Sequence, residues 1–216
     1  MTIDCLSLQS RERAMNAAIP HEKDFEFADR LQRALQMRSK KRLSPNGVVQ
    51  AAVLVPLFRQ DEHVKVLLTK RSELVEHHKG EISFPGGKLD DSDPDFLSCA
   101  LRETWEEIGV SPEDVRILGE LDDFYTVATG FLVVPFVGFI PYPYRFRASP
   151  REIDELLGVP LEVFLDPGWR RESTIMLDSQ PVPIISYQWE GHTIWGATAR
   201  ILQHFSEIIS NMRRQR

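Results

Sequence analysis

The sequence predicts an α/β protein in which a mixed β-sheet is flanked by helices. Short apolar runs typical of strands are interspersed with segments of helical periodicity, and this arrangement favours a sheet covered by helices. A length of 216 residues suits one domain with a substantial core. A hydrophobic content of 42% and a charged content of 27% are those of an ordinary soluble globular protein.

Residues 1–45 are expected to form an N-terminal extension with one helix, followed by a single domain over residues 46–212. Residues 1–20 are polar and weakly patterned, whereas residues 22–38 carry apolar side chains at helical spacing. The basic run Arg38-Ser39-Lys40-Lys41-Arg42 ends this segment. We interpret the run as a solvated helix end, with contact to an anionic substrate or nucleic acid as the alternative.

Strands are predicted where apolar and β-branched residues form short runs between turn signals. These runs lie at residues 48–58, 64–69, 115–124, 131–140, 152–156, 175–177 and 182–189. Pro135 falls inside the most apolar of them, and we expect a local irregularity there because proline cannot donate to a β-ladder. A helical turn at 160–165 and a C-terminal amphipathic helix at 197–212 complete the expected elements.

One helix has clear boundary signals and is predicted to run from Pro94 to Ile108. Ser92 or Asp93 can cap its N-terminus, and Pro94 suits the first helical position, where its missing N–H is no loss. Gly109 stands where a left-handed C-terminal cap is expected. A largely apolar stripe along this helix can bury against the sheet.

Three carboxylates of this helix are expected to share one face. Glu103, Glu106 and Glu107 stand at positions i, i+3 and i+4, so their side chains would point at one small volume. Three like charges this close together are unfavourable unless a cation compensates them, and hard oxygen ligands suit Mg²⁺ or Mn²⁺. Taken alone, such a spacing is more often a solvated acidic face, so the neighbouring residues decide between the two.

The neighbouring residues resemble the Nudix box. Its usual form is Gly, five residues, Glu, seven residues, Arg-Glu, an apolar residue, any residue, Glu-Glu, any residue, Gly and an apolar residue. The run from Arg102 to Val110 matches this form, with Thr104 at a position that is usually apolar. Counted from Gly87, the loop is one residue longer than usual, and Asp93 stands where Glu is expected. The resemblance implies an α/β/α sandwich with pyrophosphohydrolase activity.

A second motif resembles the signature of the coenzyme A pyrophosphatase branch of that family. It comprises Leu67–Ser72 and His78–Gly87, and Trp195–Ala199 is similar to that branch's entry into its last helix. The branch also has the longer loop and the Asp, but Glu76 stands where it usually has Arg. This resemblance covers residues 48–210. It implies cleavage of coenzyme A or its thioesters, with Mg²⁺ or Mn²⁺, into 4′-phosphopantetheine (or its acyl form) and adenosine 3′,5′-bisphosphate.

The resemblance also implies catalytic roles. Glu103, Glu106 and Glu107 would hold the metals, which lower the pKa of bound water and stabilise the leaving phosphate. Arg102 would orient a carboxylate. Glu103 and Glu152 are both candidates for the general base, and for Glu152 a solvated loop position is the alternative.

Substrate contacts are expected at four further positions. Arg71 is the phosphate candidate because a guanidinium offers bidentate hydrogen bonds to phosphate oxygens, with a surface salt bridge as the alternative. His78 is expected either to contact substrate or to be a structural histidine. Gly86 and Gly87 would bring the backbone close to the helix and the metal.

Bulk properties limit the partners and the location. A net charge of −6 argues against a general nucleic-acid-binding surface. Cys5 and Cys99 form no disulfide framework, and neither an apolar run of membrane-spanning length nor a signal-peptide pattern is present. We therefore expect a cytoplasmic protein with a small nucleotide substrate and no membrane partner. A homodimer remains open, since no residue requires one.

Two alternatives to the coenzyme A assignment remain. The runner-up is a Nudix pyrophosphatase for ADP-ribose or another nucleoside diphosphate derivative. A catalytically silent Nudix domain that senses a nucleotide or mediates protein contacts is disfavoured, because all three metal carboxylates are present.

Overall fold

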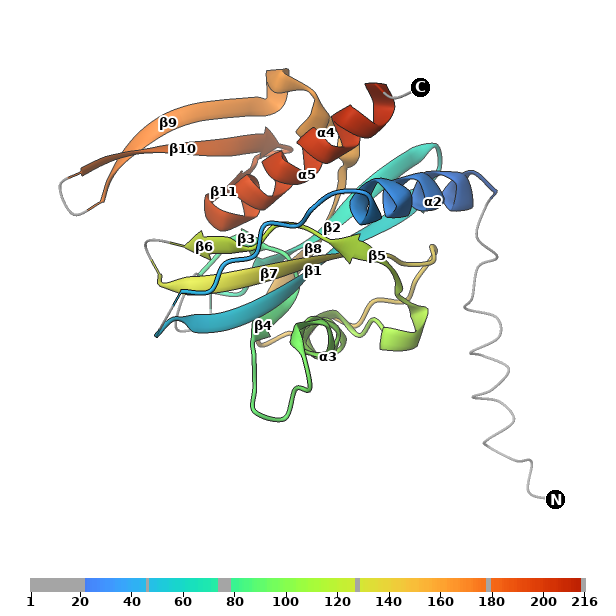
Figure 1. Ribbon diagram of the computed structural model, residues 1–216, viewed down its shortest axis with the longest axis horizontal. Coiled ribbons are helices and arrows are strands. Elements are labelled where there is room, and N and C mark those ends of the chain that lie inside the picture. Colours follow the sequence, from blue (N-terminus) through green and yellow to red (C-terminus); the bar gives the residue numbers. More distant parts are fainter. Residues whose placement is uncertain (1–21, 46, 74–78, 127–128, 178–179, 215–216) are drawn as a thin grey trace.

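The sheet lies between two helical layers, so the predicted α/β/α sandwich is confirmed (Figure 1). Helix α3 (Phe96–Ile108) covers one face, and α2 (Glu22–Gln36) and α5 (Gly196–Arg214) cover the other. This computed structural model describes residues 22–45, 47–73, 79–126, 129–177 and 180–214. None of the helices in these ranges is long and apolar enough to cross a membrane.

The main sheet is mixed. Its central strands, β1 (Val49–Gln60) and β7 (Phe131–Phe139), pair in parallel, and the other pairings are antiparallel. The strand order is β3 (Ile82–Ser83), β2 (His63–Arg71), β1, β7 and β5 (Arg116–Glu120). Three strands pair off this path: β4 (Gly86–Lys88) with β1, β6 (Phe124–Thr126) with β7, and β8 (Ile153–Pro160) with β2. This order places the diglycine of β4 beside the central strand.

A second, three-stranded antiparallel sheet follows the short helix α4 (Leu161–Leu165). It consists of β9 (Arg170–Leu177), β10 (Gln180–Trp189) and β11 (His192–Trp195). Strands β9 and β10 form a long ribbon that projects from the body of the molecule (Figure 1). Its base is tied to the body through Tyr187, which packs edge-on against Phe164 of α4.

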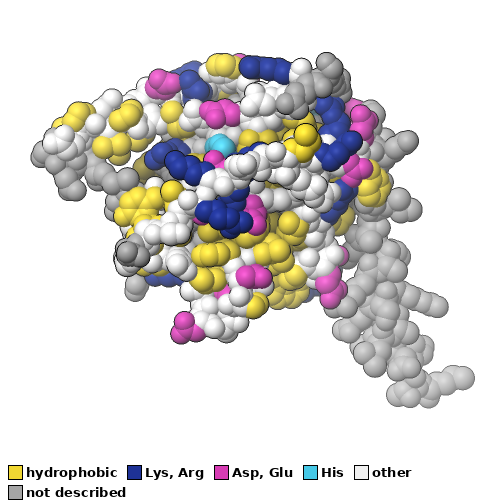
Figure 2. Space-filling view, in the orientation of Figure 1, with side chains coloured by type: hydrophobic (Ala, Val, Ile, Leu, Met, Phe, Trp, Pro, Cys, Tyr) yellow, Lys and Arg dark blue, Asp and Glu magenta, His cyan; other side chains and the backbone are white. Residues whose placement is uncertain are grey.

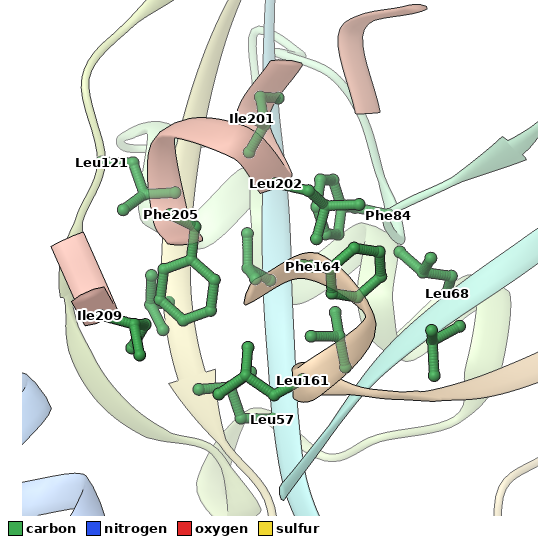
Figure 3. Packing of buried hydrophobic residues seen from close by; sticks show 14 of the residues in the cluster. Leu57, Leu68, Phe84, Leu121, Leu161, Phe164, Ile201, Leu202, Phe205 and Ile209 are labelled. Atoms are coloured by element: carbon green, nitrogen blue, oxygen red, sulfur yellow. The ribbon is translucent and has the colours of Figure 1, made fainter. Parts of the chain in front are cut away.

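Each face of the main sheet has its own hydrophobic core. One core joins the sheet to α2, α4 and α5, and Figure 3 shows Leu57 of the sheet below Phe164, Leu202 and Phe205, with Leu68 beside Phe164. The other core joins the opposite face to α3 and includes Leu54, Phe58, Cys99, Ala100, Ile108, Val134 and Phe136. Burial in this second core holds α3 against the centre of the sheet.

Some strand boundaries differ from the predictions. The single strand expected at 115–124 is two strands, β5 and β6, which pair with successive parts of β7. Pro135 lies where the partner of β7 changes, and its carbonyl accepts a hydrogen bond from the N–H of Leu121. The expected irregularity therefore falls between two partner strands, where the missing proline N–H breaks no ladder. The strand expected at 152–156 is longer, and β3, β4 and β11 were not predicted.

The interpretation of the basic run as a solvated helix end is wrong for two of its residues. Arg38 pairs with Asp122 and donates to the carbonyl of Glu120, and Lys40 lies 2.8 Å from Asp123. Lys40 also pairs with Glu120, and its side chain is only 10% exposed. Basic and acidic side chains lie side by side along the segment that leaves α2 (Figure 2). The run clamps this segment to the connection between β5 and β6.

Candidate functional site

Helix α3 carries the candidate site, and both of its ends are capped. The predicted cap at Ser92 or Asp93 is wrong: the helix starts at Phe96, and Asp95 accepts a hydrogen bond from the N–H of Ser98 at 2.7 Å. Pro94 therefore lies outside the helix, and Asp93 is available for another role. Gly109 has φ 71° and ends the helix in the left-handed cap that was predicted.

The diglycine of β4 allows the backbone to approach α3 closely. A side chain at Gly87 would collide with the carboxyl group of Glu103, and one at Gly86 would collide with the backbone of Ala52 and Val53. Gly86 also has φ 151°, a conformation that other residues rarely adopt. Its N–H donates to Glu107 at 3.3 Å. The glycines therefore place β4 directly beside two of the three candidate metal ligands.

Arg102 links the acidic residues of this region. Its Nε and Nη2 donate to the two carboxylate oxygens of Asp93, each at 2.9 Å. Its Nη1 donates to Glu103 at 2.9 Å and to Glu106 at 3.2 Å. The Asp93 side chain is only 4% exposed, and its hydrogen bonds to Arg102 hold its pKa well below the usual range.

Glu107 is the most deeply buried of the three candidate metal ligands. Its burial raises its pKa to about 8, opposed by the N–H of Gly86 and by the charge of Arg71 and reinforced by Glu103 and Glu152. Burial also raises the pKa of Glu103, against the hydrogen bond from Arg102. Acids that are buried beside other acids favour a bound cation, because the cation restores the charged form.

The donor set fits a hard divalent cation. Glu103, Glu106 and Glu107 offer carboxylate oxygens from one helix face, as Mg²⁺ and Mn²⁺ prefer. In the described part of the chain, no three Asp, Glu, His or Cys side chains already converge as a metal site. The reason is local: Arg102 holds Glu103 and Glu106, whereas Glu107 accepts from Gly86. A cation would compete with Arg102 for these oxygens.

The other residues predicted for the site lie at different distances from this cluster. Arg71 ends β2 at a bulge and is close enough for its charge to act on Glu107. Its Nε is buried and has no hydrogen-bond partner among the described residues. Glu152 is exposed, yet its charge also acts on Glu107, and its carbonyl accepts from Ser72. His78 and Glu76 lie outside the described residues.

Two features of the site were not anticipated from the sequence. Asp93 accepts two hydrogen bonds from Arg102. From the sequence, Asp93 was a candidate helix cap, so this pairing was not predicted. Thr104, at a position that is usually apolar, is fully buried, and its hydroxyl donates to the carbonyl of Ala100 at 2.6 Å. Bonding within the helix satisfies this hydroxyl, so it is tolerated in an apolar contact.

Comparisons with known proteins show which family the chain resembles. The family model described as the NUDIX domain matches residues 48–174. A protein of Enterobacter sp. (strain 638), named Uncharacterized Nudix hydrolase NudL, is 34% identical over 183 residues, 85% of this chain and 94% of that protein. A protein of the same name from Klebsiella pneumoniae is 36% identical over 157 residues, 73% of this chain and 81% of that protein.

One solved structure supports the fold. A MutT/nudix family protein from Enterococcus faecalis is similar with a TM-score of 0.53 and 17% identity, over 97% of this chain and 76% of that one.

The sandwich and its acidic helix define a hydrolase class that uses divalent metal ions to act on nucleoside diphosphate derivatives. The family match and the relatives make the assignment specific: the chain belongs to the Nudix family and is a pyrophosphohydrolase.

Proposed function

We propose that this enzyme cleaves coenzyme A or its thioesters into 4′-phosphopantetheine (or its acyl form) and adenosine 3′,5′-bisphosphate. The observation that carries the proposal is that residues of both motifs lie close together at the carboxyl group of Glu107. Arg71 and Gly86, from the two segments of the second motif, both act on Glu107 of the Nudix box. Residues that are far apart in the sequence are thus brought to one small volume.

The proposed site residues have distinct tasks. Glu103, Glu106 and Glu107 would hold Mg²⁺ or Mn²⁺, which supplies a low-pKa water and neutralises the diphosphate when bound. Arg102 orients Glu103 and Glu106 and is itself fixed by Asp93. Arg71 offers its unpartnered Nε to a phosphate oxygen. His78 is retained as a proposed substrate contact.

Two carboxylates remain candidates for the general base. Glu103 is half-buried, and burial raises its pKa, which suits proton transfer near neutral pH. Glu152 is exposed and electrostatically coupled to Glu107. Replacement of each by Gln separates the two roles: loss of the base lowers kcat across the pH range and removes the limb of the pH–rate profile that reports it.

A product assay tests the proposal. Purified protein is incubated with coenzyme A and either Mg²⁺ or Mn²⁺, and adenosine 3′,5′-bisphosphate is measured. Glu106→Gln should abolish turnover at little cost in stability, because Glu106 is exposed, and Glu113→Gln, just beyond the same helix, is the matched control. Rapid cleavage of ADP-ribose or a dinucleoside polyphosphate without cleavage of coenzyme A would show that the proposed substrate is wrong. The assignment as a pyrophosphohydrolase would still hold.

We also infer a cytoplasmic setting and keep a homodimer as a hypothesis. The free, buried thiol of Cys99 suits a reducing compartment. The projecting β9–β10 ribbon has an exposed strand edge of the kind that pairs between subunits, with Ile175 and Met176 exposed on it. Light scattering at several protein concentrations would test the homodimer.

A further inference from the structure

The β9–β10 ribbon has two free edges, and prolines close one of them. Along residues 180–185, β10 pairs with β9 on one side and with no other described strand, because its pairing with β11 begins at Ser186. Pro181 and Pro183 have no N–H to give to β9, so both stand at positions whose backbone faces the free edge. Two prolines at alternate positions prevent a further strand from pairing there.

The other edge, along β9, is open. Met176 and Thr174 lie opposite these two prolines, so their N–H and C=O groups also turn away from β10. Glu172, opposite Ile185, has the same orientation. Among the described strands β9 pairs only with β10, and every residue from Arg171 to Met176 is exposed. This edge therefore presents a row of backbone donors and acceptors to a further strand.

The ribbon also lacks the charges that usually protect an open edge. From Ser173 to Trp189 the sequence has a single charged residue, Asp178. Ile175 is exposed on one face of the ribbon, and Met176, 66% exposed, lies on the other. Figure 1 shows the ribbon extending past the described helices. A two-stranded ribbon is only marginally stable in water, so pairing with a further strand stabilises it.

We propose that two copies of this chain pair β9 with β9 in antiparallel orientation, around a two-fold axis at Ser173 or Thr174. This interface rests on the homodimer hypothesis of the proposed function and defines its contact. Opposed residues of an antiparallel pair have the same hydrogen-bonding role, so the axis of a symmetric pair passes through a residue. An axis at Arg171 or Glu172 would place two like charges opposite each other, which is destabilising.

A second copy is the occupant that fits this edge. With the axis at Ser173 or Thr174, no like charges of β9 lie opposite each other, and nearly the whole strand is paired. The net charge of −6 makes the bodies of two copies repel each other, but the projecting ribbon lets the edges meet away from the bodies (Figure 1). The pair is closed by its two-fold symmetry and leaves neither β9 edge free.

The mass of the protein in solution tests the interface. Light scattering after size-exclusion chromatography should give the mass of two chains, with dissociation on dilution. Thr174→Pro should give the mass of one chain, because proline removes an outward N–H without removing a hydrogen bond of the ribbon. Thr174→Val keeps this N–H and should remain a dimer. Circular dichroism verifies that both variants are folded.

Cysteines at the axis provide an independent test. In a chain that carries Cys5→Ser, oxidation should link either Ser173→Cys or Thr174→Cys into a covalent dimer. Opposed residues of an antiparallel pair are about 4.5–5.5 Å apart at Cα, within the range of a disulfide. Cys99 is buried, and Thr193→Cys, exposed on β11, is the control that should not cross-link.

The outcomes separate this interface from the proposed activity. The mass of one chain at every concentration would overturn the interface, and so would a dimer that persists in Thr174→Pro or the absence of cross-links from both cysteines at the axis. Cleavage of coenzyme A is measured on the same preparations. A dimer of the expected kind that does not cleave coenzyme A would refute the proposed substrate and keep the interface, and cleavage by a monomer would do the reverse.

Discussion

Asp93 and Arg102 are the residues on which the arrangement of the acidic helix depends. Arg102 donates to Asp93, Glu103 and Glu106, so one guanidinium group sets the position of three carboxylates. Eight residues separate Asp93 from Arg102, one more than in the usual form of the Nudix box. The sequence could not show the pairing itself, because Asp93 equally fits the start of a helix.

Replacing Asp93 by Asn should disturb the site more than the fold. The Asn keeps one acceptor for Arg102 but removes the buried negative charge, so we expect a loss of about 1–3 kcal/mol in the free energy of unfolding. Arg102 would also lose its fixed position, and kcat should fall at least about tenfold. Urea unfolding and steady-state kinetics measure the two effects. Asp91→Asn, an exposed residue in the same loop, should change neither.

The buried carboxyl group of Glu107 predicts an unusual dependence of stability on pH. Its pKa is about 8 in the folded protein without metal, against 4.5 as the reference for the unfolded chain. Between these values the folded state holds a proton that the unfolded state has released, so stability falls as the pH rises through this window. Glu107→Gln should remove this loss of stability at higher pH, and its amide oxygen can still accept the hydrogen bond from the N–H of Gly86. With EDTA at pH 7, the variant should be more stable on the order of 2 kcal/mol.

Added metal ion should reverse this difference. A divalent cation favours the ionised form of Glu107, so Mg²⁺ should stabilise the unaltered protein most at high pH and stabilise the Gln variant less. Melting temperatures from pH 5 to pH 8.5, with EDTA or with Mg²⁺, measure both effects. Parallel profiles for the two proteins in EDTA would show that Glu107 ionises normally.

Among the elements, α3 was predictable at its C-terminal end, but not at its first residue. The apolar stripe and Gly109 are local signals, and both are confirmed by the structure. Its start depends on whether Ser92, Asp93 or Asp95 caps it, and tertiary contact with Arg102 removes Asp93 from that choice. The strands β3, β4 and β11 have two to four residues, too few for a readable period. Strand β4 forms because its glycines fit beside α3.

The N-terminal cap of α3 gives a prediction for the element as a whole. Asp95→Ala removes the acceptor for the N–H of Ser98 and should lower the melting temperature by roughly 2–4 °C, as expected for the loss of a helix cap. KM and kcat should change little, because the carboxylates lie two turns further on. Thermal unfolding followed by circular dichroism measures the effect. Pro94→Ala should hardly change the melting temperature. A larger decrease would show that Pro94 belongs to the helix.

At the scale of the whole molecule, the sequence predicted the layers but not the contacts that join distant segments. Apolar patterns give the sheet and its helices, because each pattern is local. The clamp between the basic run and the β5–β6 connection joins residues about 80 apart, and such pairing cannot be read from either segment alone. For the same reason, the extension over residues 1–45 looked separate from the domain over 46–212, a division that remains a prediction.

The packing of α2 predicts that these two parts fold together. Ala28, Leu31 and Leu35 of α2 are buried in the core shared with α5, and Leu35 packs on Gly119 of β5. Burying each leucine contributes about 1.5–3 kcal/mol, so losing α2 and its clamp removes roughly 5 kcal/mol from a net stability of about 5–15 kcal/mol. A chain that begins at residue 46 should therefore unfold at least about 10 °C lower than one that begins at Glu22, or fail to fold. Thermal and urea unfolding of the two chains measure this. Equal melting temperatures for both would show that α2 contributes no stability to the sheet that carries the site.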